Sequence, residues 1–240
     1  MILILTATAL EQDRLRESLA DPTTETFAHR PHVSGALEGV PVSLLETGIG
    51  CVNTAQALTA FLETHSPQAV LQVGVGGAYR LSGLGVGDLA VAASETYADA
   101  GVATPDGWRP LDLIGIPVLR TGEEDIYNVI PVDTSLATKA ASALEEMDGL
   151  KVQSGPFATV QQCSGVADLG DVVAERFKAI CENMEGAAAA HIAALYGVPF
   201  LEVRAISNLV ENRDLSKWDL PGAASRVQSA ALTLLPRLFG

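Results

Sequence analysis

Apolar residues along this chain fall into two patterns: short continuous runs, and longer stretches in which they recur every third or fourth position. A run of about four to eight apolar residues is typical of a buried strand, and a recurrence near 3.6 is typical of a helix with one buried face. Strands are predicted at residues 2–5, 33–37, 42–45, 69–75, 89–93 and 152–160. Helices are predicted at residues 9–19, 52–63, 134–147, 169–177 and 223–235.

Strands and helices alternate along the chain, and this order is typical of an α/β domain. We therefore predict one domain over residues 1–240, with a central mixed, mostly parallel sheet flanked by helices on both faces. Residues 33–37 and 42–45 are expected to pair as a hairpin. Residues 97–127 are rich in Gly, Pro and Asp and have weak periodicity, so a long loop is expected there.

A short Ala-rich helix and a strand follow one another in residues 183–208. Glu185 stands at the predicted start of the helix, where the helix dipole favours a carboxylate. Gly197 is a plausible residue to end the helix, and Pro199 cannot continue it. Glu185 is therefore either a simple N-terminal charge or a site residue, and its neighbours decide between the two.

The strand after this helix is apolar except for two charges and ends in Ser207 and Asn208. Glu202 and Arg204 lie on one face of the strand because side chains alternate with period two. A buried charge persists only when it is paired or used, so the two charges predict a site at the carboxyl end of the strand. The alternative is a purely structural Glu-Arg pair between two elements.

Composition excludes several classes of partner. The net charge of −14 opposes binding to nucleic acid or to an anionic membrane surface. The three cysteines fit neither a disulfide framework nor a zinc pattern, which favours a reducing, cytoplasmic location. No apolar run reaches the length of about 20 residues that a membrane span requires. The glycine spacing fits neither a dinucleotide fingerprint nor a Walker A loop.

Short motifs occur in a fixed order along the whole chain. They are the turn at residues 7–11, Thr-Gly-Ile-Gly at 47–50, Val-Gly-Val-Gly-Gly at 73–77, Val-Gly-Asp-Leu at 86–89, Met-Glu at 184–185 and Ser-Asn at 207–208. In this order they resemble the motifs of the nucleoside phosphorylase and nucleosidase superfamily. The resemblance implies a nucleoside phosphorylase-like fold, a purine nucleoside as the small-molecule substrate, no metal or organic cofactor, and a homo-oligomer, either a dimer or a dimer of dimers.

The resemblance also assigns roles to individual residues. It implies that Glu185, with Met184, holds the ribose and that Glu11 activates water. The alternative for Glu11 is a solvated residue of the helix. Asp13 is the weaker candidate for activating water, because a helix would turn its side chain away from the cleft that Glu11 faces. The expected substrate-binding residues are Gly74, Val75, Gly76, Met184, Arg204, Ser207, Arg213 and Trp218, and the expected catalytic residues are Glu11, Glu185 and Asn208.

Two features separate the reactions known in the superfamily. Its phosphorylases carry a Gly-Asp-Pro turn where this chain has an acid, Glu11, which would repel phosphate, so water is the expected acceptor. Relatives that cleave adenine nucleosides carry Asp at the position of Asn208. An amide offers an NH₂ donor to a 6-oxo group and a carbonyl oxygen to a protonated N7, so Asn208 favours a 6-oxopurine.

Within the superfamily, the motif set resembles that of the futalosine hydrolases, which release hypoxanthine from futalosine on a route to menaquinone. Arg213 and Trp218 would then meet the carboxyaryl group at the 5′ side, unless they are surface packing. Three alternatives stay open: a methylthioadenosine/adenosylhomocysteine-type nucleosidase, a purine nucleoside phosphorylase, and a domain that binds a nucleoside without cleaving it. No base-stacking residue is recognisable in residues 159–165, which contain no aromatic side chain.

Overall fold

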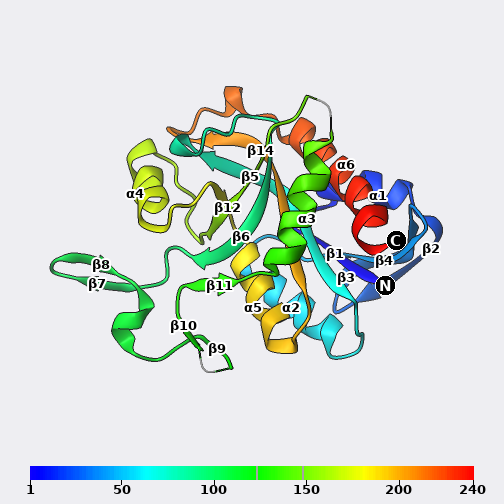
Figure 1. Ribbon diagram of the computed structural model, residues 1–240, viewed down its shortest axis with the longest axis horizontal. Coiled ribbons are helices and arrows are strands. Elements are labelled where there is room, and N and C mark those ends of the chain that lie inside the picture. The colour runs from blue at the N-terminus through cyan, green and yellow to red at the C-terminus, as the bar shows by residue number, and fades with distance from the viewer. Residues whose placement is uncertain (123, 148) are drawn as a thin grey trace.

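The computed structural model describes residues 1–122, 124–147 and 149–240 and is built around one mixed sheet (Figure 1). Within these ranges the sheet has ten strands in the order β11-β6-β12-β13-β5-β1-β4-β3-β2, and β14 pairs with both β5 and β6. Its strands are β1 (Ile2–Thr6), β2 (Ala20–Phe27), β3 (Arg30–Leu37), β4 (Val40–Glu46), β5 (Ala69–Tyr79), β6 (Leu89–Tyr97), β11 (Val129–Pro131), β12 (Val152–Thr159), β13 (Cys181–Asn183) and β14 (Phe200–Val210).

The sheet contains both parallel and antiparallel pairs of strands. Strand β1 runs parallel to β4 and β5, and β5 runs parallel to β14. Antiparallel pairs join β14 to β6, β13 to β5, and the hairpin strands β2, β3 and β4. The mixed α/β sheet expected from the sequence is therefore confirmed, and the carboxyl ends of β1, β5 and β14 meet at one edge.

Helices cover both faces of the sheet. On one face lie α1 (Asp13–Glu17), α3 (Thr134–Glu145) and α6 (Leu220–Phe239), which bury the largest apolar cluster. On the other face lie α2 (Cys51–Leu62) and α5 (Gly186–Tyr196), whose buried alanines allow close packing. Helix α4 (Ala167–Phe177) packs beside β12 (Figure 1). No helix in the described ranges is both long and apolar enough to cross a membrane.

The predicted helix at residues 9–19 is wrong in its first half. Residues 9–11 form a single 3-10 turn, and the backbone of Gln12 leaves the helical region, with φ −131° and ψ −8°. The cause is the Glu11 side chain, which turns back to bind the backbone and hydroxyl of Thr8. The α-helix begins only at Asp13.

Three further elements differ from the sequence prediction. The polar edge strand β2 was not predicted, because exposed Thr and Glu residues give no hydrophobic signal. Strand β14 does not end at Ser207 and Asn208 but continues to Val210, with an irregularity in its pairing between Ile206 and Asn208. Helix α6 continues past Pro236 to Phe239, beyond the end at residue 235 expected from proline.

The predicted long loop at residues 97–127 contains regular structure. It holds two small hairpins, β7 (Val102–Thr104) with β8 (Gly107–Arg109) and β9 (Leu119–Thr121) with β10 (Glu124–Ile126), which extend from the body of the molecule (Figure 1). Trp108 lies against α4, with the Arg176 guanidinium 4.0 Å from the centre of its ring. The hairpin is therefore anchored to its own chain.

Candidate active site

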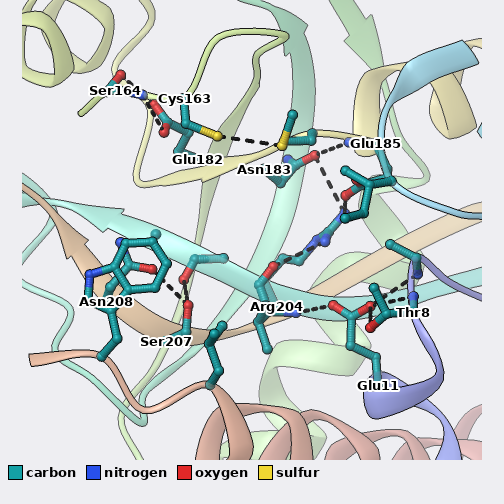
Figure 2. Close-up of a pocket in the computed structure, with 18 of the residues that line it drawn as sticks. Thr8, Glu11, Cys163, Ser164, Glu182, Asn183, Glu185, Arg204, Ser207 and Asn208 are labelled. Atoms are coloured by element: carbon teal, nitrogen blue, oxygen red, sulfur yellow. Dashed lines mark hydrogen bonds and ion pairs between the residues drawn. The ribbon is translucent and has the colours of Figure 1, made fainter. Parts of the chain in front are cut away.

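A cavity of about 380 Å³ opens where the carboxyl ends of β1, β5 and β14 meet (Figure 2). The structure brings nearly all of the predicted site residues to its wall. They are Glu11, Val75, Gly76, Met184, Glu185, Arg204, Ser207, Asn208, Arg213 and Trp218. Gly74 alone among the predicted residues does not line the cavity, and its role is different.

Glu11 is held inside the turn that follows β1. Its Oε2 accepts hydrogen bonds from the backbone N–H of Ala7 at 3.1 Å and from the N–H and hydroxyl of Thr8 at 2.9 and 3.0 Å. Its Oε1 accepts from the N–H of Val75 at 2.9 Å. Burial raises the pKa of Glu11 above its ordinary value, against the opposing effect of the Arg204 charge. A buried carboxylate with raised pKa suits a general base.

Gly74 makes room for this arrangement. A Cβ atom on Gly74 would lie 2.6 Å from Arg204 Nη1 and 2.7 Å from Glu11 Oε1. Both neighbours are buried and hydrogen-bonded, so neither can move away easily. Gly74 is required by the close approach of Glu11 and Arg204 and not by contact with a ligand.

Glu185 faces Glu11 across Arg204. Its Oε1 accepts from the N–H of Gly50 at 2.9 Å, and its Oε2 accepts from Arg204 Nη2 at 3.2 Å. The Gly50 backbone is left-handed, with φ 93°, which aims this N–H at the carboxylate and explains the glycine at the end of the Thr-Gly-Ile-Gly motif. Arg204 also donates from Nη1 to the carbonyl oxygen of Val75 at 3.1 Å.

Arg204 is anchored from behind by a second carboxylate. Its Nε donates to Glu202 Oε1 at 2.8 Å, and both side chains are fully or almost fully buried. The two charges in β14 are therefore paired with each other, as the structural alternative supposed, and Arg204 also reaches the cavity. The Glu202–Arg204 pair is therefore a buried ion pair within β14 that also contributes Arg204 to the cavity wall.

Glu95 faces Glu202 and completes this buried group. Glu95 accepts from Asn183 Nδ2 at 2.6 Å, from the Thr159 hydroxyl at 2.7 Å and from its neighbouring N–H at 3.1 Å. Burial, and then the charge of Glu202, raise the pKa of Glu95 well above its ordinary value. The raised pKa favours a proton on Glu95, and Glu202 Oε2, a buried atom with no other hydrogen-bond partner among the described residues, can accept a hydrogen bond from it.

At the opposite end of the cavity lie two uncharged polar groups, the hydroxyl of Ser207 and the amide of Asn208. Ser207 Oγ lies 3.2 Å from the Gly76 carbonyl and 2.8 Å from Asn208 Oδ1, and Asn208 Nδ2 donates to the Leu209 carbonyl at 3.0 Å. Among the described residues, one N–H and one lone pair of the Asn208 amide have no partner and are left for a ligand. The Met184 side chain also lines the cavity, with its sulfur 3.5 Å from Cys163 Sγ.

Glu182 is a site residue that the sequence prediction missed. It is 8% exposed, lines the cavity, and accepts from the hydroxyl groups of Tyr79 at 3.0 Å and Ser164 at 2.6 Å. The sequence does contain a sign of its role, because Glu182 is a charged residue next to a short apolar run, as Glu202 is. Glu95 in β6 could have been found in the same way.

Arg213 and Trp218 lie together at the outer mouth of the cavity. The Arg213 guanidinium is 4.8 Å from the centre of the Trp218 ring. The wall nearby includes the apolar side chains of Leu10, Ile49 and Leu220. The Nδ1 atom of His191 lies 3.2 Å from the Tyr97 hydroxyl, and His191 is not part of the cavity wall. Among the residues described, no group of three or more His, Cys, Asp or Glu could hold a metal ion.

Comparison with known proteins identifies the family. A family model described as the phosphorylase superfamily matches residues 1–236. A Thermus thermophilus protein named futalosine hydrolase is 36% identical over 199 residues, 83% of each chain. The Bacillus subtilis 5′-methylthioadenosine/S-adenosylhomocysteine nucleosidase is 28% identical over 221 residues, 92% of this chain and 90% of the relative.

Solved structures share the fold over the whole length. The Neisseria meningitidis 5′-methylthioadenosine/S-adenosylhomocysteine nucleosidase, in complex with methylthio-immucillin-A, superposes with a TM-score of 0.85 at 21% identity and covers 99% of both chains. At 21% sequence identity, this similarity shows that the two proteins share a fold. Because the family model spans nearly the whole chain and the relatives are named as nucleosidases and hydrolases, this chain is an N-glycosyl hydrolase that belongs to the phosphorylase superfamily.

Proposed function

We propose that this chain hydrolyses the N-glycosidic bond of futalosine and releases hypoxanthine and dehypoxanthine futalosine. The observation that carries the proposal is the arrangement of the cavity. Two buried carboxylates, Glu11 and Glu185, lie on either side of Arg204 at one end of the cavity, and Arg204 donates to Glu185. The amide of Asn208 lies at the other end. The 36% identity to a protein named futalosine hydrolase supports the same substrate.

Cleavage of a purine riboside gives the sugar positive charge in the transition state. Glu185 would hold the 2′-hydroxyl and stabilise this charge, because a carboxylate fixed by Gly50 and Arg204 needs no reorganisation during the reaction. Glu11 would take a proton from the attacking water. Its Oε1 accepts one hydrogen bond within the described residues and so has a lone pair for that water.

Water is favoured over phosphate as the acceptor. The N–H groups of Ala7 and Thr8 and the Thr8 hydroxyl form the kind of donor cluster that binds anions. Here the chain's own Glu11 carboxylate occupies that cluster. A phosphate group would have to displace a buried carboxylate or lie beside it, at an electrostatic cost.

The remaining groups of the cavity suit the rest of futalosine. The free N–H and the free lone pair of Asn208 match O6 and a protonated N7 of hypoxanthine. Arg213 would pair with the carboxylate of the 5′ group, while Trp218, Leu10 and Leu220 provide an apolar wall for its aryl ring. An enzyme that acts on methylthioadenosine would need no cation at this mouth.

The test is incubation with futalosine, inosine and methylthioadenosine, each with and without phosphate, followed by chromatography of the released bases. We expect hypoxanthine from futalosine at a rate that phosphate does not change. A sugar 1-phosphate product would contradict hydrolysis. Faster release of adenine from methylthioadenosine would favour the methylthioadenosine-type alternative, and no free base from any substrate would favour a binding module.

A further inference from the structure

Glu182 and Asn208 stand on opposite sides of Gly77 in the sheet. Glu182 in β13 and Asn208 in β14 are both register partners of Gly77 in β5. Directly paired residues point to the same face of a sheet, and all three line the cavity. Two strand spacings separate the flanking backbones by about 9–10 Å. Because Gly77 has no side chain, no other side chain on this row of the sheet stands between Glu182 and Asn208.

A planar base bound over Gly77 would therefore meet one of these two side chains at each edge. A Cβ atom on Gly77 would lie 2.9 Å from Val210 Cγ2 and 3.2 Å from Asn208 Nδ2, so only glycine fits beside these side chains. Figure 2 shows Glu182 beside Ser164 on one side of the pocket and Asn208 beside Ser207 on another, away from Glu11 and Arg204. The base end and the sugar end of the cavity are therefore separate.

The Glu182 carboxylate presents only acceptors to the cavity. Its Oε2 accepts from the Tyr79 and Ser164 hydroxyl groups, and its Oε1 accepts from the Ser164 N–H at 3.0 Å. A carboxylate offers about four acceptor positions, so within the described part of the chain one position on Oε1 is left. The Ser164 N–H, a donor that would suit an unprotonated ring nitrogen, is already used by Glu182.

The two classes of purine differ at the ring nitrogen N1. A 6-oxopurine carries a hydrogen on N1, whereas a 6-aminopurine has a lone pair there. We propose that Glu182 is a specificity-determining residue that accepts a hydrogen bond from N1–H of a 6-oxopurine, while Asn208 binds the N7 and O6 edge. This role rests on the proposed function, because it names the group that reads the second edge of the same base.

The test compares wild type with Glu182→Gln in competition between inosine and adenosine, with phosphate absent. The amide of Gln can still accept from N1–H, but without a charge, and it can also donate to an N1 lone pair, so we expect the preference for inosine to fall about 10-fold or more. Glu211→Gln is the matched control. Glu211 is a carboxylate on the same cavity wall that binds Lys217 at 2.8 Å, and its variant should keep the wild-type preference.

A binding measurement on the unmodified chain keeps the proposal testable if Glu182→Gln does not fold. By calorimetry, 1-methylhypoxanthine should bind about 10-fold or more weakly than hypoxanthine, because the methyl group replaces the N1 hydrogen. Equal binding of the two bases would overturn the role of Glu182. An equal loss of preference in Glu182→Gln and Glu211→Gln would also overturn it, since the effect would then be the loss of any negative charge.

The two proposals fail in different ways. If wild type releases no base from any purine nucleoside, the proposed function fails and the role of Glu182 fails with it. If wild type prefers the 6-oxo substrate and Glu182→Gln keeps that preference, only the role of Glu182 is overturned.

Discussion

At the scale of single residues, the site depends on carboxylates held in different ways. Glu11 is surrounded by backbone donors, Glu185 is held by one N–H and one guanidinium, and Glu202 is fixed to the same guanidinium. The Glu202–Arg204 pair was found as two charges in an apolar strand, whereas Glu11 and Glu185 were found because they match motifs of the superfamily. Glu182 and Glu95 also stand beside apolar runs, but they were missed because they belong to none of those motifs.

Removing the charge of either proposed catalytic carboxylate should abolish most of the turnover. We expect Glu11→Gln and Glu185→Gln each to lower kcat by about 10²–10⁴-fold, because proton transfer or stabilisation of the sugar cation is lost. Steady-state release of base measures this. The matched control is Asp13→Asn, an exposed acid two residues after Glu11, which should keep wild-type turnover. Near wild-type activity in either glutamine variant would show that the wrong carboxylate was named.

The proton shared by Glu95 and Glu202 should make folding stability depend on pH. The folded pair keeps a proton that the unfolded chain releases above the ordinary glutamate pKa of 4.5, so the folded state binds one more proton. Stability contributed by this proton is lost as pH rises toward the raised pKa, with a slope of about 1.4 kcal/mol per pH unit. In Glu202→Gln the amide donates to Glu95 in place of the proton and the charge of Glu202 is gone, so this slope should become smaller, with only burial still raising the pKa of Glu95.

Urea unfolding at several pH values between about 6 and 8 measures the difference. We expect the free energy of unfolding of wild type to fall relative to that of Glu202→Gln as pH increases. Parallel pH profiles for the two proteins would mean that no proton is shared.

At the scale of elements, hydrophobic periodicity predicted the buried core well and the polar parts poorly. Helix α2, the hairpin of β3 and β4, and the step from α5 to β14 lie where expected, because each has a buried face or a glycine stop. The helix predicted at residues 9–19 failed because one side-chain contact, Glu11 to Thr8, outweighed helix propensity. The hairpins within residues 97–127 were missed because their strands are three residues long, and a single buried residue in β9 (Leu119) and in β10 (Ile126) is too few to form a repeating pattern.

The start of α5 provides a test of how tightly the elements are fitted. A Cβ atom on Gly186 would lie 2.1 Å from Glu95 Oε1 and 2.3 Å from Glu202 Oε2. Overpacking of a buried site costs about 1–3 kcal/mol. This exceeds the gain of about 1 kcal/mol that alanine brings to a helix interior over glycine. Gly186→Ala should therefore lower the free energy of unfolding.

Gly165→Ala is the control for this substitution, since nothing described lies within 4 Å of a Cβ atom placed there. It should leave the stability nearly unchanged. A Gly186→Ala protein as stable as wild type in urea would mean that α5 can move away from the buried carboxylates.

At the scale of the whole molecule, we predict that exposed apolar side chains form an interface with a second copy of the chain. They gather at the start of α2 and around the segment before β9, and include Ile49, Val52, Leu113, Ile114, Ile116 and Val118. Val52 is 81% exposed and Ile116 is 71% exposed, which is unusual for such side chains. With the family resemblance, this favours a homodimer in which residues 97–108 lie near the neighbour's cleft.

Light scattering should report twice the 25.0 kDa chain mass at micromolar concentration. Val52→Asp should shift the mass toward that of one chain, because the charge would be buried at the interface. Val172→Asp, at an exposed valine of α4, is the control and should keep the wild-type mass. A single-chain mass for wild type would remove the dimer.

The central claim is that this cavity cleaves a 6-oxopurine nucleoside with water. The most direct measurement mixes equal amounts of futalosine and its 6-amino analogue in one phosphate-free reaction and follows both bases by chromatography, so that the ratio of products equals the ratio of kcat/KM values. We predict about 10-fold or more hypoxanthine over adenine, because a mismatched base leaves buried polar groups unpaired. Equal amounts of the two bases, an excess of adenine, or no cleavage until phosphate is added would contradict the claim.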